Sequence, residues 1–219
     1  MNSTRKPQRK KPGPGKSPER SSAILSTAAK LFFKQGYTQT TMDMIAAQAN
    51  VSKLTVYKHF GSKQALFEAM IHQKMEENLS QSTYKGFTGK APHQELCQIA
   101  QGFINIVYSH EGLSIYRLVI SESNNPNSVI PALFYEQAIL KSCKQLENYL
   151  EKVETHYQYC FNPKPHWVSF FFGLFDGISY KRSLLGIYDN RYTIPGFNDV
   201  ENSVSLFLKI NQKHYDEFA

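Results

Sequence analysis

The side chains best suited to chemistry gather in a short segment, residues 52–59, where hydroxyl, ammonium, phenol and imidazole groups follow one another. Threonine can bond to base edges, lysine to guanine or phosphate, and tyrosine to phosphate, while leucine can cover a thymine methyl group. If this segment is helical, Val51, Val56 and Phe60 form its apolar side. The side chains left facing outward are Lys53, Leu54, Thr55, Tyr57 and Lys58. Their chemistry is that of DNA recognition.

The flanking residues indicate the elements that must position this segment. Thr41 is a good N-cap for a short helix, and Ser52 is a good N-cap for the next one. Asn50 between them tolerates the left-handed conformation that a tight turn requires. Two short helices joined by such a turn predict a helix-turn-helix at 41–60, whose second helix enters the major groove.

Lys63 lies in the first turn of a further helix, which Ser62 is expected to cap. A cation is unfavourable at this positive end of the helix dipole, so we expect a compensating partner. A DNA phosphate held by Lys63 and by the free backbone N–H groups would supply one. A solvated lysine is the alternative.

Helical patterning continues on both sides of this unit and predicts an all-α protein. Upstream, Ser17-Pro18-Glu19 is a typical helix start and Gly36 a typical helix end. Downstream, a loop is expected at 83–92, and Gly and Pro then separate helices at about 93–110, 112–123, 127–158, 164–187 and 198–214. We predict a disordered basic tail (1–16), a three-helix helix-turn-helix domain (17–64) and a helical regulatory and dimerisation domain (65–219).

Positive charge is concentrated at the N-terminus. The first 20 residues carry seven Lys or Arg and one Glu, so they account for +6 of the net charge of +7. Such a tail is attracted to polyanions such as DNA, or it merely keeps the chain in solution. The three cysteines, Cys97, Cys143 and Cys160, are far apart. This spacing argues against a disulfide framework or a thiolate zinc site and fits a reducing cytoplasm.

Residues 20–66 resemble the N-terminal, AcrR-type domain of the TetR family of regulators. That family's pattern runs F-x-x-x-G-[YF], T-T, I-A-x-x-A-G-V-S, [TS]-[LIV]-Y-x-[HY]-F and S-K-x-x-L. The matching residues are Phe33, Gly36-Tyr37, Thr40-Thr41, Ile45-Ala46, Ala49, Val51-Ser52, Thr55-Val56-Tyr57, His59-Phe60, Ser62-Lys63 and Leu66. So many residue types in fixed order make the resemblance specific. Asn50 stands where the family usually has glycine, and Leu54 where it usually has a small residue.

The resemblance implies a homodimeric regulator that binds a pseudo-palindromic operator in double-stranded DNA and, as a repressor, is released by a small molecule. It assigns phosphate contacts to Tyr57, His59 and Lys63. Contacts near the bases or the backbone fall to Lys53, Thr55 and Lys58, and the predicted DNA-binding set is completed by Thr41, Ser52 and Leu54. His59 has a structural role as its alternative.

An aromatic-rich segment, 166–185, carries apolar side chains on more than one face. A helix of this kind must be buried nearly all round, and a second subunit would cover it. We expect a dimer interface from Trp167, Phe171, Phe172, Leu174, Ile178 and Phe207. The stretches 116–136 and 170–186 are also similar to AefR-like C-terminal domains.

A pocket for a small apolar or aromatic ligand is expected between the C-terminal helices. The predicted ligand-binding residues are Phe103, Val107, Tyr108, Tyr116, Arg117, Phe134 and Phe175. Each aromatic residue, taken singly, is equally typical of an ordinary core. Arg117 and Glu122 could orient a ligand or form a salt bridge.

Enzymatic function finds no support, because the sequence has no nucleophile elbow, no Walker loop and no HExxH motif. We expect no cofactor and no metal. No stretch reaches the roughly 18 apolar residues of a membrane helix, and no apolar region follows the basic N-terminus. We therefore expect a cytoplasmic, nucleoid-associated protein. The alternative function is an effector-independent, architectural or partner-binding DNA-binding protein of the same fold.

Overall fold

The computed structural model describes residues 17–81, 87–187 and 193–212, and within these ranges every regular element is helical. The elements are α1 (Pro18–Gln35), α2 (Met42–Gln48), α3 (Lys53–Phe60), α4 (Lys63–Gln81), α5 (Pro92–Val107), α6 (His110–Glu122), α7 (Ile130–Phe134), the π-helical η1 (Tyr135–Leu140), α8 (Lys141–His156), α9 (Lys164–Gly173), α10 (Ile178–Leu185) and α11 (Phe197–Asn211). The predicted all-α class is confirmed. The predicted tail (1–16) and residues 83–86 of the predicted loop lie outside the described residues.

Local chemistry fixes the ends of α1. The helix begins at Pro18, whose missing N–H costs nothing at the first helical position. Ser17 is the N-cap, although its side chain makes no capping hydrogen bond. The helix ends at Gly36, which takes a φ of 85° that a residue with a Cβ rarely adopts. The start and the end predicted for this helix are both confirmed.

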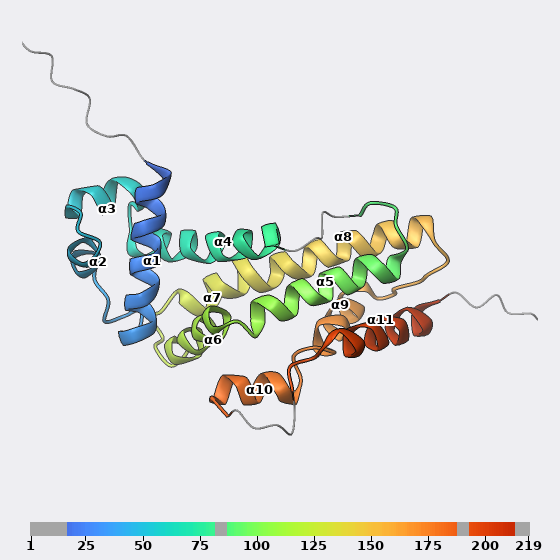
Figure 1. Ribbon diagram of the computed structural model, residues 1–219. Helices are drawn as coiled ribbons and strands as arrows, with labels where there is room; N and C mark the ends of the chain where they lie inside the picture. The colour runs from blue at the N-terminus through green and yellow to red at the C-terminus, as the bar shows by residue number, and fades with distance from the viewer. Residues whose placement is uncertain (1–16, 82–86, 188–192, 213–219) are drawn as a thin grey trace, which may run out of the picture.

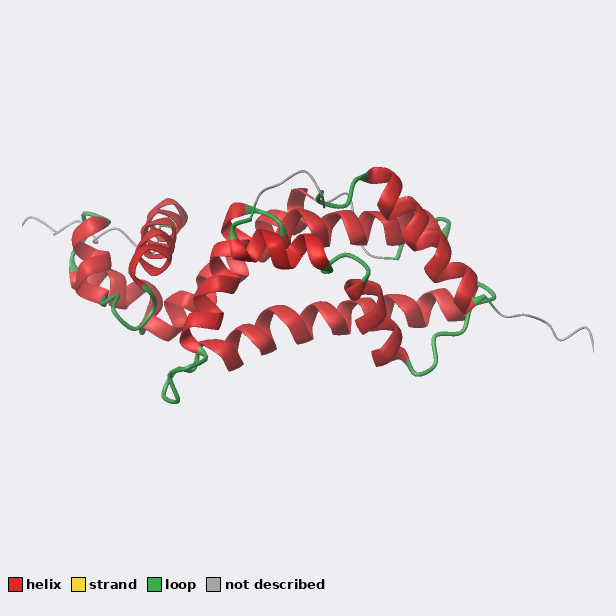
Figure 2. Cartoon of the chain, turned by 90° about the horizontal axis from the view of Figure 1, so that it is seen from below, coloured by secondary structure: helices red, strands yellow, loops and turns green. Residues whose placement is uncertain are grey.

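The helices are arranged around two apolar cores along an elongated molecule (Figures 1 and 2). The first core lies among α1–α4 and also takes in buried side chains of α6 and α7. The second is built from α5, α8, α9 and α11, with α11 packed along α5 and α9 against α8. In Figure 1, α1, α2 and α3 form one end, and α4 leads from them toward the rest of the chain.

The single helix predicted at 164–187 is wrong, because the chain leaves the helix after Gly173 and re-enters it at Ile178. Phe175 in the intervening turn is 1% exposed and belongs to the second core. Its carbonyl oxygen accepts a hydrogen bond from the hydroxyl of Tyr108 (2.9 Å). Glycines at both ends of the turn, Gly173 and Gly177, give the backbone this freedom. Part of the aromatic segment is therefore buried within its own chain rather than by a second subunit.

Candidate DNA-binding surface and internal cavity

Helix α3 presents most of the predicted DNA-facing side chains. The hydroxyl of Ser52 accepts a hydrogen bond from the backbone N–H of Thr55 (3.1 Å), so the predicted cap is present. Val56 is fully buried and fixes the inner side of the helix in the first core. The exposed side chains are Lys53, Leu54, Tyr57 and Lys58. Leu54 is 62% exposed on a two-turn helix, which leaves it free to meet a partner.

The turn before α3 has the predicted geometry. The hydroxyl of Thr41 accepts a hydrogen bond from the backbone N–H of Met44 (3.2 Å) and caps α2. Asn50 takes a φ of 53°, the left-handed conformation. An ion pair between Lys53 Nζ and Asp43 (2.8 Å) joins α3 to α2. Both side chains are exposed, so the pair adds little stability and can open toward a phosphate.

Thr55 and His59 are half-buried and lie at the edge of this exposed set. The Thr55 hydroxyl is 2.8 Å from that of Ser52. The His59 ring lies beside that of Phe60, with 5.9 Å between their centroids. Both residues stay predicted DNA contacts, and His59 has a packing role as well.

The sequence predicts that the ammonium of Lys63 is free to bind a DNA phosphate, but in the structure this ammonium already has partners within the chain. Its Nζ lies 2.9 Å from the carbonyl oxygens of Tyr37 and Thr40 and 3.4 Å from that of Thr38. It also lies 4.3 Å from the centroid of the Tyr37 ring. Burial lowers the pKa of this ammonium, although the charge of Glu122 acts in the opposite direction. Its three N–H donors are directed at carbonyl groups, so Lys63 ties α4 to the turn that follows α1.

Glu122, at the end of α6, ties the same turn to the C-terminal helices. Its carboxylate accepts hydrogen bonds from the backbone N–H (3.1 Å) and the hydroxyl (2.9 Å) of Thr38 and from the hydroxyl of Ser128 (2.8 Å). Glu122 is 6% exposed. Burial alone would raise its pKa, but these hydrogen bonds and the ammonium of Lys63 hold the pKa below its ordinary value. The sequence offered no signal for this link, because its partners lie 84 residues apart.

A cavity of about 540 Å³ lies among α4, α5, α6, α8, α9 and their neighbours. Four of the predicted ligand residues line it: Phe103, Val107, Tyr116 and Phe134. Three of these residues form an aromatic wall together with Phe172: the Tyr116 ring centroid is 5.8 Å from that of Phe134, and the Phe103 centroid is 4.7 Å from that of Phe172. The size is that of pockets that take small molecules.

The charge of the cavity lining was not predicted from the sequence. Glu111, Glu147 and Asp176 contribute to it, and among the described lining residues there is no Lys, Arg or His. Partial burial raises the pKa of Asp176, although the charge of Lys181 lowers it. The described lining of the cavity is therefore mainly apolar and aromatic, and its charged residues are all acidic.

Three predicted ligand residues do not line the cavity. Tyr108 and Phe175 are 9% and 1% exposed and are bonded to each other within the second core. Arg117 donates from Nε to the carbonyl of Leu184 (2.8 Å) and from Nη2 to that of Ser183 (2.6 Å). It therefore satisfies carbonyls at the end of α10, where a cation also suits the helix dipole. Arg117 therefore does not line the cavity, and no bond between Arg117 and Glu122 is found in the described part of the chain.

The residues predicted to form the dimer interface differ in how far they are exposed. Phe171 and Phe207 are fully buried in their own chain, so their assignment to the dimer interface is wrong. Phe172 is half-buried and lines the cavity, and its interface role stays a prediction. Trp167 and Leu174 are half-buried, and Ile178 is 56% exposed. The apolar side chains exposed on α9–α11 are Phe170, Ile178, Leu185, Phe197, Leu206 and Ile210. The alternation of buried and exposed faces on α11 was visible in the sequence, but not which face was inner.

Membrane insertion has no candidate among the described helices, since each is too short or too polar to cross the apolar part of a bilayer.

Comparison with known proteins agrees with the geometry of α1–α4. Residues 24–70 match the model of the bacterial regulatory proteins of the tetR family. The HTH-type transcriptional activator FasR of Mycolicibacterium smegmatis is 31% identical over 101 residues, which are 46% of this chain and 45% of that protein. The negative transcriptional regulator of the biofilm operon icaADBC, IcaR of Staphylococcus aureus, is 40% identical over 48 residues, 22% of this chain and 26% of that one. The aligned stretches thus span less than half of either relative.

The remainder of the chain is matched by its fold. The solved structure of the flavonoid-responsive regulator FrrA superposes with a TM-score of 0.73 at 24% identity and covers 91% of this chain and 100% of that one. The AcrR-type and AefR-like subdivisions stay predictions. Residues 24–70 thus match the tetR family model, and along most of its length the chain shares the fold of the regulator FrrA.

Proposed function

We propose that this protein is a sequence-specific, DNA-binding transcriptional regulator, and that it represses transcription until a small molecule releases it from its operator. The observation that carries the proposal is the exposed side of α3. It sets Lys53, Leu54, Tyr57 and Lys58 around a buried Val56, on a segment that matches the tetR family. Such a helix can place its side chains against base edges and phosphates in the major groove. The DNA partner would keep the protein in the cytoplasm, at the nucleoid.

The proposed operator complex contains two copies of the chain. Two exposed apolar side chains of α11, Leu206 and Ile210, lie one turn apart on one face of that helix. Phe170 of α9 lies near the same helix, since its ring centroid is 6.5 Å from that of Phe207 on α11. A second copy related by two-fold symmetry would cover this surface and present two α3 helices to two half-sites.

The proposed ligand is an aromatic or apolar molecule that carries a positive charge or several hydrogen-bond donors. The aromatic wall favours a flat apolar body, and cation–π attraction adds to the affinity for a cation. The three acidic residues, with no basic residue beside them in the described lining, disfavour a carboxylate or phosphate. Phenolic hydroxyls are also donors, so a flavonoid, the class to which FrrA responds by its name, belongs in the ligand panel.

Two helices would connect the cavity to the DNA-binding surface. Ile71 of α4 and Tyr116 of α6 line the cavity. The same helices hold the turn after α1 through Lys63 and Glu122. A ligand that shifts either helix would therefore change the separation of the two α3 helices. It would do so only as far as it binds the two arrangements with different affinity.

The first test is selection of DNA fragments by the purified full-length protein at near-physiological salt. One pseudo-palindromic site supports the proposal, and Leu54→Ala and Lys58→Ala should then weaken binding to it. A matched control is Lys30→Ala, an exposed lysine of α1. Binding without preference, lost steeply as salt rises, would instead support an architectural protein. Reporter transcription with and without the protein then separates repression from activation.

The dimer and the ligand are tested separately. Leu206→Glu together with Ile210→Glu should convert a dimer to a monomer in sedimentation velocity, whereas Ile120→Glu, which is equally exposed on α6, should not. Ligand release is tested by titrating the operator complex with aromatic compounds of similar size that are cationic, neutral or anionic. Equal responses to the cation and the anion would contradict the proposed ligand class.

A further inference from the structure

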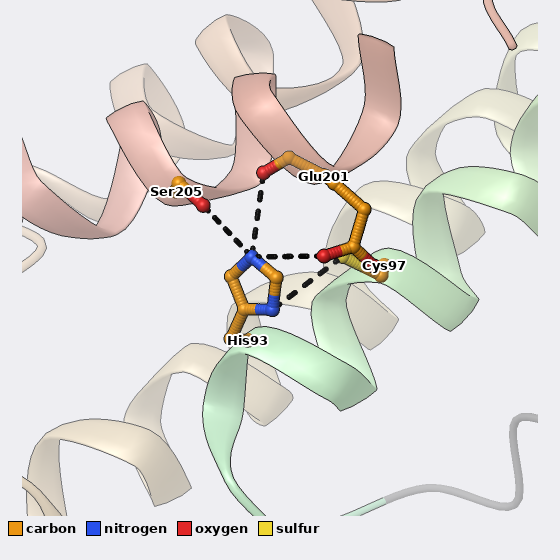
Figure 3. Close-up of polar contacts among 4 residues, drawn as sticks. All are labelled: His93, Cys97, Glu201 and Ser205. Atoms are coloured by element: carbon orange, nitrogen blue, oxygen red, sulfur yellow. Dashed lines mark hydrogen bonds and ion pairs between the residues drawn. The ribbon is translucent and has the colours of Figure 1, made fainter. Parts of the chain in front are cut away.

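A cluster of three metal-ligating side chains lies between α5 and α11, apart from the cavity lining and from α3. His93 and Cys97 are one turn apart on α5, and Glu201 faces them from α11 (Figure 3). One ligand atom from each residue lies within 4.8 Å of the others. The side chains of His93 and Glu201 are 32% and 36% exposed, while Cys97 is 9% exposed. The cluster therefore has a buried sulfur with access from solvent.

The distances in the cluster are slightly longer than those that a tetrahedral metal site requires. Metal–ligand bonds of about 2.0–2.3 Å to nitrogen, oxygen and sulfur place neighbouring ligand atoms roughly 3.3–3.8 Å apart. Cys97 Sγ is 3.9 Å from His93 Nδ1. A carboxylate oxygen of Glu201 lies within 4.8 Å of the ligand atoms of the other two residues, and its Oε2 is 3.6 Å from the second ring nitrogen of His93, Nε2. Small side-chain rotations would be enough to direct a ring nitrogen, the sulfur and a carboxylate oxygen at one point.

The imidazole of His93 is also oriented by contacts of its second ring nitrogen, Nε2. Its Nε2 is 2.9 Å from the hydroxyl of Ser205 and 3.3 Å from the backbone carbonyl oxygen of Glu201. With Nε2–H donating to these oxygens, Nδ1 is left with its lone pair toward Cys97 (Figure 3). Metal-bound histidines typically donate their second ring N–H to such an oxygen, which fixes the orientation of the ring.

We propose that His93, Cys97 and Glu201 form a binding site for a divalent first-row transition metal ion, with Zn²⁺ as the best-fitting ion. A borderline-soft ion accepts this mixture of nitrogen, sulfur and oxygen, and water completes a four-coordinate site. When the Zn–S bond forms, the thiol proton of Cys97 leaves to solvent and the thiolate becomes the ligand. Burial and the charge of Glu201 raise the pKa of this thiol to about 12, so that proton release lowers the net affinity.

The site would join two helices with different roles. Helix α5 lines the cavity with Phe103 and Val107, and α11 carries the exposed Leu206 and Ile210. A metal bound across them stabilises the folded chain by mass action and restrains any sliding of α11 along α5. Metal and cavity ligand would therefore be separate inputs to one protein.

The test is titration of the untagged full-length protein with Co²⁺ and Zn²⁺ in the absence of DNA and other ligands. We expect one Co²⁺ per chain, a thiolate-to-cobalt charge-transfer band with tetrahedral ligand-field bands, and displacement of Co²⁺ by Zn²⁺. Calorimetry then gives the Zn²⁺ affinity. The proposal is overturned if the wild-type chain shows no thiolate band, whatever its DNA binding.

Variants assign the ligands. Cys97→Ser should abolish the charge-transfer band, and His93→Gln and Glu201→Gln should each weaken Zn²⁺ at least about tenfold. Cys160→Ser is the matched control, because Cys160 is an exposed cysteine outside the cluster, and it should leave both readouts unchanged. Loss of the band in Cys160→Ser with retention in Cys97→Ser would overturn the assignment. Thermal melting of each variant without metal checks that it folds.

Discussion

Replacement of Glu122 by glutamine tests whether its carboxylate holds the turn after α1 to the C-terminal helices. Glutamine keeps the shape and one acceptor oxygen, but it removes the charge and turns the second acceptor into a donor. Hydrogen bonds to charged groups contribute about 1.5–3 kcal/mol each. The Thr38 and Ser128 hydroxyls can rotate to new partners, so the loss is centred on the backbone N–H of Thr38. We expect Glu122→Gln to lower the free energy of unfolding by about 1–2 kcal/mol near neutral pH.

The assay is equilibrium unfolding in guanidinium chloride at a fixed protomer concentration, since a dimer's stability depends on concentration. Glu136→Gln is the control, because Glu136 is an exposed carboxylate on η1. It should change stability by less than about 0.5 kcal/mol. If Glu122→Gln lost no more than this control, the carboxylate would not hold the turn.

The pH dependence of the Glu122→Gln effect has a definite sign. The folded chain holds the pKa of Glu122 below its ordinary value. The stabilisation is therefore fully present above the ordinary value, about 4.3, and is lost as the pH falls through the lower folded-state pKa. The difference between wild type and Glu122→Gln should shrink below about pH 4.3. A difference that stayed constant from pH 7 to pH 3.5 would refute the electrostatic part of the reasoning.

Three further substitutions separate structural roles from contact roles. Val56→Ala should cost about 1–3 kcal/mol of stability by leaving a cavity under α3, whereas Leu54→Ala should leave denaturant unfolding unchanged and weaken operator binding in a mobility-shift assay. Lys63→Met should cost about 2 kcal/mol, since it leaves carbonyls of the turn after α1 without their donor; unchanged unfolding would show that the lysine serves DNA alone. Tyr108→Phe should cost about 1 kcal/mol by removing the bond to the carbonyl of Phe175, and a ligand affinity changed more than the stability would return Tyr108 to the pocket.

The helix-turn-helix could be predicted from the sequence because short-range chemistry specifies it. The hydroxyls of Thr41 and Ser52 reach backbone N–H groups three residues onward, and Asn50 needs only its own φ. Val56 shares one side of the two-turn helix α3 with Phe60, and Val51 precedes them, so these apolar residues define the inner side. Each of these features depends on residues that are only a few positions apart in the sequence.

The errors arise where a side chain's partner is distant in the chain. Composition could show that Phe171 and Phe207 seek burial, but not that they meet each other, with ring centroids 5.2 Å apart, and so leave the surface. The position of Lys63 in the first turn of a helix correctly predicted that it has a partner, but that partner is a turn 23–26 residues earlier in the chain. His93 and Cys97 carried a readable signal, two ligand types at i and i+4, but Glu201 joins them only because α11 packs along α5.

Helix α6 is the element whose two ends make a connection between cavity and DNA-binding surface physically reasonable. Near its start, Gly112 lies so close to the carbonyl of Ile106 that a Cβ would come within 2.0 Å of that oxygen, so this end is fixed to α5. Its other end is bonded through Glu122 to Thr38. If the start of α6 stays fixed against α5, a ligand that displaces Tyr116 in the middle of the helix would also displace Glu122 at its end. Substitutions at Tyr116 and Glu122 should therefore be non-additive in their effect on ligand-dependent operator affinity, and simple addition would mean that α4 transmits the signal instead.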